Sequence, residues 1–222
     1  MKLTHPLLEQ RIEFEDNKVN LMVVENPILF RNLIKEISLQ IEGEPGQFIL
    51  SDSKREYSMK KKMTILFSPF ELDVNNSKIM TKTVNCLKEA AQDMEMILEK
   101  QQISREISAY LLKLRDLCDL NLCFSEEAEL GYLIKSMGPY YSNNQTELIE
   151  VILSYTDLYA SLFANEIFVL VNFKSYLDQT EVIELYKEAA YKKINLLLLE
   201  NKEYPHLDGE TQILIDQDLC EI

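Results

Sequence analysis

Glycine is scarce in this chain, and the glycines present do not form a phosphate-binding loop. The five glycines among its 222 residues assemble neither a P-loop nor a G-x-G-x-x-G sequence. The segment that follows the apolar run 19–24 has no glycine and begins with an acid, Glu25, followed by Asn26 and Pro27. Such a segment offers no cradle of backbone amides and would repel phosphate. We therefore do not expect nucleotide hydrolysis.

Histidine and closely spaced cysteines are also lacking. Only His5 and His206 are present, both near the ends of the chain, and no serine lies in a G-x-S-x-G turn. Catalysis by a nucleophile with a histidine base is therefore not expected. The four cysteines show no C-x-x-C spacing, which argues against a zinc site and indicates buried free thiols.

Long hydrophobic runs are missing as well. No stretch approaches the roughly 20 apolar residues that a membrane-spanning helix needs. The first residues, Met1 to Leu8, lack the apolar core of a signal peptide. Hydrophobic residues still make up 46% of the chain, enough for the core of one large domain or two modest ones. The sequence therefore predicts a cytoplasmic protein with a substantial core.

Positive charge is in deficit, since 23 lysines and arginines stand against 37 acids, a net charge of −14. Taken alone, this argues against nucleic acid, because DNA affinity comes mainly from cations placed on phosphates. The charge is unevenly distributed, however. Residues 200–222 hold seven acids and one lysine, whereas residues 54–62 hold one acid and five cations. These cations are Lys54, Arg55, Lys60, Lys61 and Lys62. Two interpretations stay open: a dedicated cationic face, or an ordinary acidic surface with one basic loop.

Two apolar runs in the last third of the chain carry the clearest fold signal. Residues 167–171 and 194–199 flank a polar segment of helical period, a pattern that predicts a βαβ unit with strands buried on both faces. Further strands are predicted at 11–15, 19–24, 47–50 and 63–67, and a helix is predicted to start at Asn26 and Pro27. The sequence therefore predicts an α/β fold with a mostly parallel sheet.

The middle of the chain is almost wholly helical in character. Residues 73–77 supply capping side chains for a helix that begins near Ser77. Ile107, Leu111 and Leu114 lie on one face of a later helix. We therefore predict an α/β head in two parts, residues 1–76 and 164–222, interrupted by an all-helical leg at 77–163. A helical protrusion of this kind is a natural site for self-association.

Acids gather between two helices of the predicted leg. They are Asp116, Asp119, Glu126, Glu127 and Glu129. Carboxylate oxygens are ligands for hard cations, so this cluster is the best candidate for a metal site, including that of a carboxylate-based metal nuclease. The alternative is ordinary capping and solvation, because acids at a helix end and in the first turn of the next helix are common.

Several motifs occur in an order that is typical of one protein family. They are Leu7 and Leu8, the strand and turn at 67–77, Leu133–Gly138, the βαβ unit at 167–200 and a closing strand at 212–216. In this order and spacing the chain resembles the small accessory spacer-acquisition protein of type II-A CRISPR systems, as a divergent member. The resemblance runs over nearly the whole chain, including the inserted helical region.

The resemblance implies a fold and a function. It implies a head distantly like P-loop ATPases but without the Walker motif, a helical leg, and a homotetrameric ring without enzymatic activity. Such a ring threads double-stranded DNA through a lysine-lined hole, entering at free ends, and calcium stabilises it. The implied partners are the CRISPR integrase complex and the effector nuclease, in antiviral defence.

The resemblance also assigns candidate residues. Lys54, Arg55, the lysines at 60–62 and Lys135 are expected to contact DNA phosphates without reading bases. Asp119, Glu126 and Glu129 are expected to hold calcium. Two other functions stay open: an acidic scaffold that docks the integrase and effector proteins without binding DNA, and an enzyme with a carboxylate-metal site.

Overall fold

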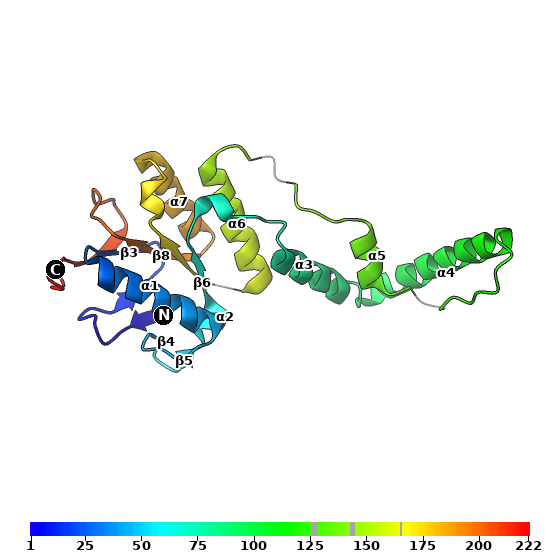
Figure 1. Ribbon diagram of the computed structural model, residues 1–222, viewed down its shortest axis with the longest axis horizontal. Coiled ribbons are helices and arrows are strands. Elements are labelled where there is room, and N and C mark those ends of the chain that lie inside the picture. The colour runs from blue at the N-terminus through cyan, green and yellow to red at the C-terminus, as the bar shows by residue number, and fades with distance from the viewer. Residues whose placement is uncertain (126–127, 143–144, 165) are drawn as a thin grey trace. The chain divides into compact units, whose positions relative to one another are not determined.

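The computed structural model describes residues 1–125, 128–142, 145–164 and 166–222. The chain divides into two compact units (Figure 1). Unit 1 comprises Met1–Asp73 and Asn144–Ile222, and unit 2 comprises Val74–Asn143. None of the helices in the described ranges is long and apolar enough to cross a membrane. The cysteines are free thiols, but the prediction that they are buried is wrong for Cys118, Cys123 and Cys220, which are exposed.

A five-stranded parallel sheet forms the centre of unit 1. Its strand order is β6-β7-β8-β3-β9, and every neighbouring pair is parallel. The strands are β6 (Met63–Leu66), β7 (Ile167–Val171), β8 (Asn195–Glu200), β3 (Val19–Val24) and β9 (Glu210–Ile215). The expected α/β class and the predicted βαβ unit are confirmed.

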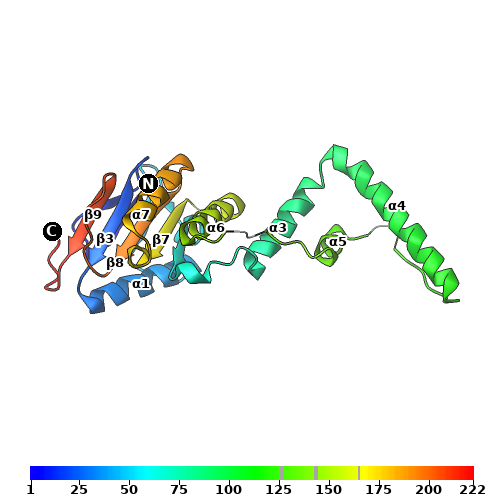
Figure 2. The same cartoon turned by 90° about the horizontal axis from the view of Figure 1, so that it is seen from above.

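Helices cover both faces of this sheet (Figure 2), which is why most residues of its central strands are apolar. Successive side chains of a strand point to opposite faces. Val169 and Met22 belong to the buried cluster that includes Leu33 of α1 (Pro27–Glu42). On the other face, the ring of Phe168 meets that of Tyr159 in α6 (Leu148–Phe163), with centroids 6.1 Å apart. Helix α7 (Gln179–Tyr191) packs beside α6.

Side-chain capping marks where α1 and α7 begin. The Asn26 side chain accepts hydrogen bonds from the amides of Ile28 and Leu29 at the start of α1. Asp178 and Glu181 form a reciprocal capping box at the start of α7. The helix start predicted at Asn26 is therefore confirmed.

A second, antiparallel sheet adds to unit 1. Its order is β2-β1-β4-β5, formed by β2 (Ile12–Glu13), β1 (Lys2–Thr4), β4 (Ile49–Ser51) and β5 (Glu56–Tyr57). The short helix α2 (Met59–Lys62) then leads into β6, and the 3₁₀ turns η1 (Pro69–Glu71) and η2 (Phe173–Ser175) follow β6 and β7. The strands predicted near 11–15 and 47–50 therefore lie outside the parallel sheet.

Unit 2 is helical, with α3 (Ser77–Ala90), α4 (Met94–Leu117) and α5 (Leu130–Ser136). Asn75 ties the entry of this unit to its exit, because its side chain donates to the carbonyl of Tyr141 at 3.0 Å and accepts from the Tyr141 amide at 2.7 Å. The inserted unit ends before α6, whereas the sequence predicts a leg to residue 163. The apolar face of α6, including the fully buried Ile152, packs on the sheet of unit 1.

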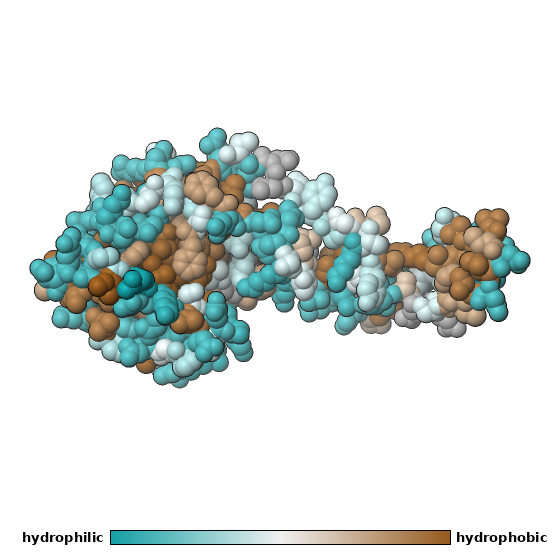
Figure 3. All heavy atoms as spheres, in the orientation of Figure 1, coloured by the Kyte–Doolittle hydropathy of each residue, from teal (hydrophilic) through white to brown (hydrophobic). Residues whose placement is uncertain are grey.

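Helix α4 and the segment after it expose many large apolar side chains, and Figure 3 shows hydrophobic surface over α4. Met94 is 84% exposed, Leu98 72% and Leu117 83%. Such fractions are unusual for a helix of 24 residues in a monomer. This face of unit 2 is therefore a candidate contact surface.

Candidate nucleic-acid interface

The turn between β4 and β5 presents two of the predicted DNA-binding cations, Lys54 and Arg55. The hairpin closes with a hydrogen bond from the Asp52 amide to the Arg55 carbonyl at 3.0 Å. The Asp52 carboxylate accepts the amides of Lys54 at 2.6 Å and Arg55 at 2.9 Å through its Oδ1 atom. Both amides are therefore satisfied inside the turn, and only the cationic side chains are left to meet a partner.

Tyr57 connects this turn to the basic helix that follows. Its hydroxyl donates to Asp52 Oδ2 at 2.5 Å. Its ring lies 4.8 Å from the Arg55 guanidinium and 5.9 Å from the Lys62 ammonium, within cation–π range. Hydrogen bonds from the Tyr57 hydroxyl and from the two turn amides hold the pKa of Asp52 at about 2. Asp52 is consequently a carboxylate at any physiological pH.

The three lysines of α2 have different surroundings. Lys60 donates to the carbonyl of Glu42 at 2.9 Å, at the C-terminus of α1, where a cation is favourable. Lys62 is paired with the carboxylate of Glu166, next to the start of β7. Lys61 is exposed. Within the part of the chain that the structure describes, Lys54, Arg55 and Lys61 form no ion pair.

The basic segment therefore divides into structural and available cations. Lys60 and Lys62 have partners at the end of α1 and beside β7, whereas Lys54, Arg55 and Lys61 form no ion pair among the described residues and can bind an external anion. The structure places the sixth predicted cation, Lys135, on the exposed surface of α5 in unit 2.

The predicted calcium ligands are only partly described. Asp119 follows α4 with a left-handed φ of 51° and is exposed. Glu129 precedes α5, and its Oε1 lies 3.5 Å from the Lys88 ammonium. Glu126, like Glu127, lies outside the described residues. The described residues hold no group of three potential ligands, and calcium takes six to eight oxygens. Calcium binding stays a prediction.

Comparison with known proteins identifies the family. The model of the CRISPR-associated protein family Cas_Csn2 matches residues 40–219. This chain belongs to the Cas_Csn2 family. The predicted resemblance to the accessory protein of type II-A CRISPR systems is thereby confirmed.

Other comparisons add little to the Cas_Csn2 assignment. A putative ABC transporter ATP-binding protein from Pyrococcus furiosus is similar over 96% of this chain and 97% of its own, with 19% identity and a TM-score of 0.42. That likeness is too low to indicate an activity. No curated protein matches this chain.

The Cas_Csn2 chain also contains buried charges that sequence reasoning missed. Lys174 and Glu210 form an ion pair whose side chains are 3% and 0% exposed, and the Tyr186 hydroxyl donates to the same carboxylate at 2.6 Å. The sequence places Glu200 and Glu210 in an acidic tail, but both are buried in the sheet. Position could have indicated Glu200, which directly follows the apolar run 196–199, whereas Glu210 adjoins no such run.

Glu200 is the least satisfied of these groups. It is fully buried at the carboxyl end of β8, and its Oε1 accepts the Lys174 amide at 3.0 Å. Its Oε2 has no hydrogen-bond partner among the described residues. Burial raises the pKa of this carboxyl to about 7, although Lys174 and Lys202 act to lower it. Burial and the Glu210 carboxylate likewise raise the pKa of Tyr186.

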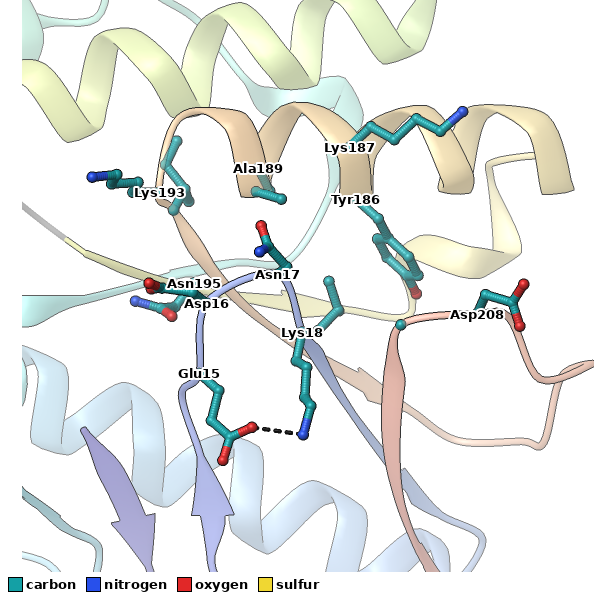
Figure 4. A pocket seen from close by; sticks show the side chains of 14 residues that line it. Glu15, Asp16, Asn17, Lys18, Tyr186, Lys187, Ala189, Lys193, Asn195 and Asp208 are labelled. Atoms are coloured by element: carbon teal, nitrogen blue, oxygen red, sulfur yellow. Dashed lines mark ion pairs between the residues drawn. The ribbon is translucent and has the colours of Figure 1, made fainter.

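A cavity of about 330 Å³ lies where β3, β8 and β9 begin (Figure 4). Three lysines and three acids line it: Lys18, Lys187, Lys193, Glu15, Asp16 and Asp208. Glu15 and Lys18 form an ion pair, with Glu15 Oε2 2.6 Å from Lys18 Nζ. Equal numbers of opposite charges give this cavity no preference for phosphate, so it does not compete with the cationic turn as an anion site.

Proposed function

We propose that this Cas_Csn2 protein binds double-stranded DNA without reading its sequence, as a non-catalytic component of CRISPR spacer acquisition. One observation carries the proposal: Lys54, Arg55 and Lys61 are exposed, without ion pairs in the described part of the chain, and gathered on eight residues of a chain with a net charge of −14. A cluster of cations without ion-pair partners on a strongly acidic protein suits a polyanion, which the acidic remainder repels.

The mode of contact follows from the turn. Its two amides are bonded to Asp52, so the Lys54 ammonium and the Arg55 guanidinium are the groups that can reach a ligand. Such groups neutralise phosphates and carry no base information by themselves. The expected signature is an affinity that falls with salt by a slope of about 0.9 for each phosphate contacted.

Assembly into a homotetrameric ring that DNA enters at free ends is part of this proposal. The exposed apolar face of α4 supports self-association, because a monomer would leave it in water. A few cations on each of four copies would together surround a duplex. Calcium held by Asp119, Glu126 and Glu129 would stabilise the assembly, and the integrase complex and effector nuclease are its proposed partners.

The proposal is tested by charge reversal at the available cations. Lys54→Glu and Lys61→Glu are expected to weaken binding to a linear duplex at least tenfold and to reduce the salt slope. Lys187→Glu serves as the control, since Lys187 is an exposed lysine on α7 of the same unit. Unchanged binding in both variants, or equal loss in the control, would remove the cationic turn from the interface.

A second candidate function is an acidic docking scaffold for the integrase and effector proteins, without direct DNA contact. The net charge of −14 favours it, because a strongly acidic protein attracts basic partners. One binding comparison distinguishes the two functions. If the immobilised protein retains the purified integrase complex at low salt but does not retain a linear duplex, the scaffold function is supported.

A further inference from the structure

The cationic turn is held in one shape by a chain of contacts that starts in the core. Leu50 of β4 is 1% exposed, and Tyr57 of β5 pairs with it across the hairpin. Tyr57 is itself partly buried against the core cluster. From this anchored position its hydroxyl reaches Asp52 Oδ2 at 2.5 Å. Asp52 is thus fixed by the core even though it lies at the base of an exposed turn.

Asp52 in turn fixes the backbone of the two cationic residues, Lys54 and Arg55. Its other oxygen, Oδ1, accepts the amides of Lys54 and Arg55 at 2.6 and 2.9 Å. Two hydrogen bonds to one carboxylate oxygen fix the backbone of both residues relative to β5. The Tyr57 ring meanwhile holds the Arg55 guanidinium at 4.8 Å. The backbone and one of the two side chains are therefore ordered before any ligand arrives.

We infer that Asp52 and Tyr57 are positioning residues of the DNA interface, which shape the turn that presents Lys54 and Arg55 to phosphate; this inference rests on the proposed DNA binding. Binding side chains that are already ordered costs less conformational entropy than ordering them on contact. Asp52 carries the same charge sign as DNA, so simple electrostatics predicts that it weakens binding. If Asp52 positions the turn, it strengthens DNA binding instead. Whether removal of Asp52 raises or lowers the affinity for DNA therefore distinguishes the two effects.

The acid is tested against a matched neighbour. Glu56 is an exposed acid at the same turn, so Glu56→Ala and Asp52→Ala remove the same charge close to the same cations. Only Asp52→Ala also removes the turn hydrogen bonds. We expect Asp52→Ala to bind a linear duplex about threefold to tenfold more weakly than Glu56→Ala at the same salt concentration. Equal affinity, or tighter binding by Asp52→Ala, would overturn the inference.

The tyrosine is tested without any change of charge. Tyr57→Phe keeps the ring under Arg55 and removes only the hydroxyl that holds Asp52. It is expected to weaken binding about threefold to tenfold with an unchanged salt slope, since the same phosphates are contacted. Tyr191→Phe is the control, because Tyr191 is 83% exposed in the same unit. A Tyr57→Phe affinity equal to that of the control would contradict the positioning role.

The same binding measurements distinguish failure of the positioning role from failure of the proposed DNA binding. Lys54→Glu and Arg55→Glu test the interface itself, and retained binding in both would overturn the interface together with its positioning. Loss of binding in those two variants, with Tyr57→Phe and Asp52→Ala matching their controls, would overturn the positioning role alone. A melting temperature within about 2 °C of wild type confirms that each variant is folded.

Discussion

Glu200 gives the sharpest test of the buried charges, because replacing it by glutamine should have a small effect on stability at low pH and a large stabilising effect at high pH. Burial raises the pKa of its carboxyl from 4.5 to about 7. A pKa raised by about 2.5 units corresponds to roughly 3 kcal/mol, at about 1.36 kcal/mol per unit. The folded state binds the proton more tightly, so this destabilisation is absent below about pH 4.5, grows as the pH rises to about 7 and is complete above that.

The measurement is urea unfolding of wild type and Glu200→Gln at pH values from 5 to 8. Glutamine resembles the protonated acid, since its carbonyl can still accept the Lys174 amide. The variant should be more stable than wild type by less than about 1 kcal/mol at pH 5 and by about 3 kcal/mol at pH 8. Glu184→Gln, at an exposed site on α7, should show no such dependence. A difference between Glu200→Gln and wild type that does not change with pH would refute the account of this site.

Three further predictions concern stability. Lys62→Glu should destabilise by about 1 kcal/mol, because it breaks the pair with Glu166 and sets two acids together, and Lys61→Glu should be neutral by the same urea measurement. Phe168→Ala should cost about 3–5 kcal/mol, since a fully buried ring between α6 and the sheet is lost; a cost under 1 kcal/mol would contradict that packing. Asp178→Ala should cost about 1 kcal/mol through the capping box of α7, read as a lower melting temperature, and an unchanged value would refute it.

Sequence reasoning worked where the pattern of apolar residues is local. The runs at 167–171 and 194–199 are apolar on both faces, and only a strand between two layers of helices buries them fully. They predicted the βαβ unit correctly, and Asn26 marked the start of α1. The extent of the helical insertion was harder to predict, because α6 has the same helical period as α3 and α4. Its apolar face packs on the sheet, and sequence periodicity does not reveal the partner of a helix.

At the candidate interface, too, the sequence predicted local features but not long-range contacts. The density of cations at 54–62 was visible in the sequence, but their separation into structural and available groups was not. Lys60 meets the end of α1, 18 residues earlier in the chain, and Lys62 meets Glu166, 104 residues later. Such long-range contacts depend on the fold. Glu200 was misplaced for a related reason, because an acid at the end of a strand looks solvent-exposed until the loop that covers it is known.

The central proposal is that this Cas_Csn2 protein assembles into a ring that DNA enters at free ends. The most direct measurement is a gel shift on linear and covalently closed circular duplexes of one sequence, each with and without calcium. The account predicts binding to the linear form, little binding to the circle, and stronger retention with calcium. Equal binding to both forms would contradict entry at free ends, and binding to neither would contradict DNA binding altogether.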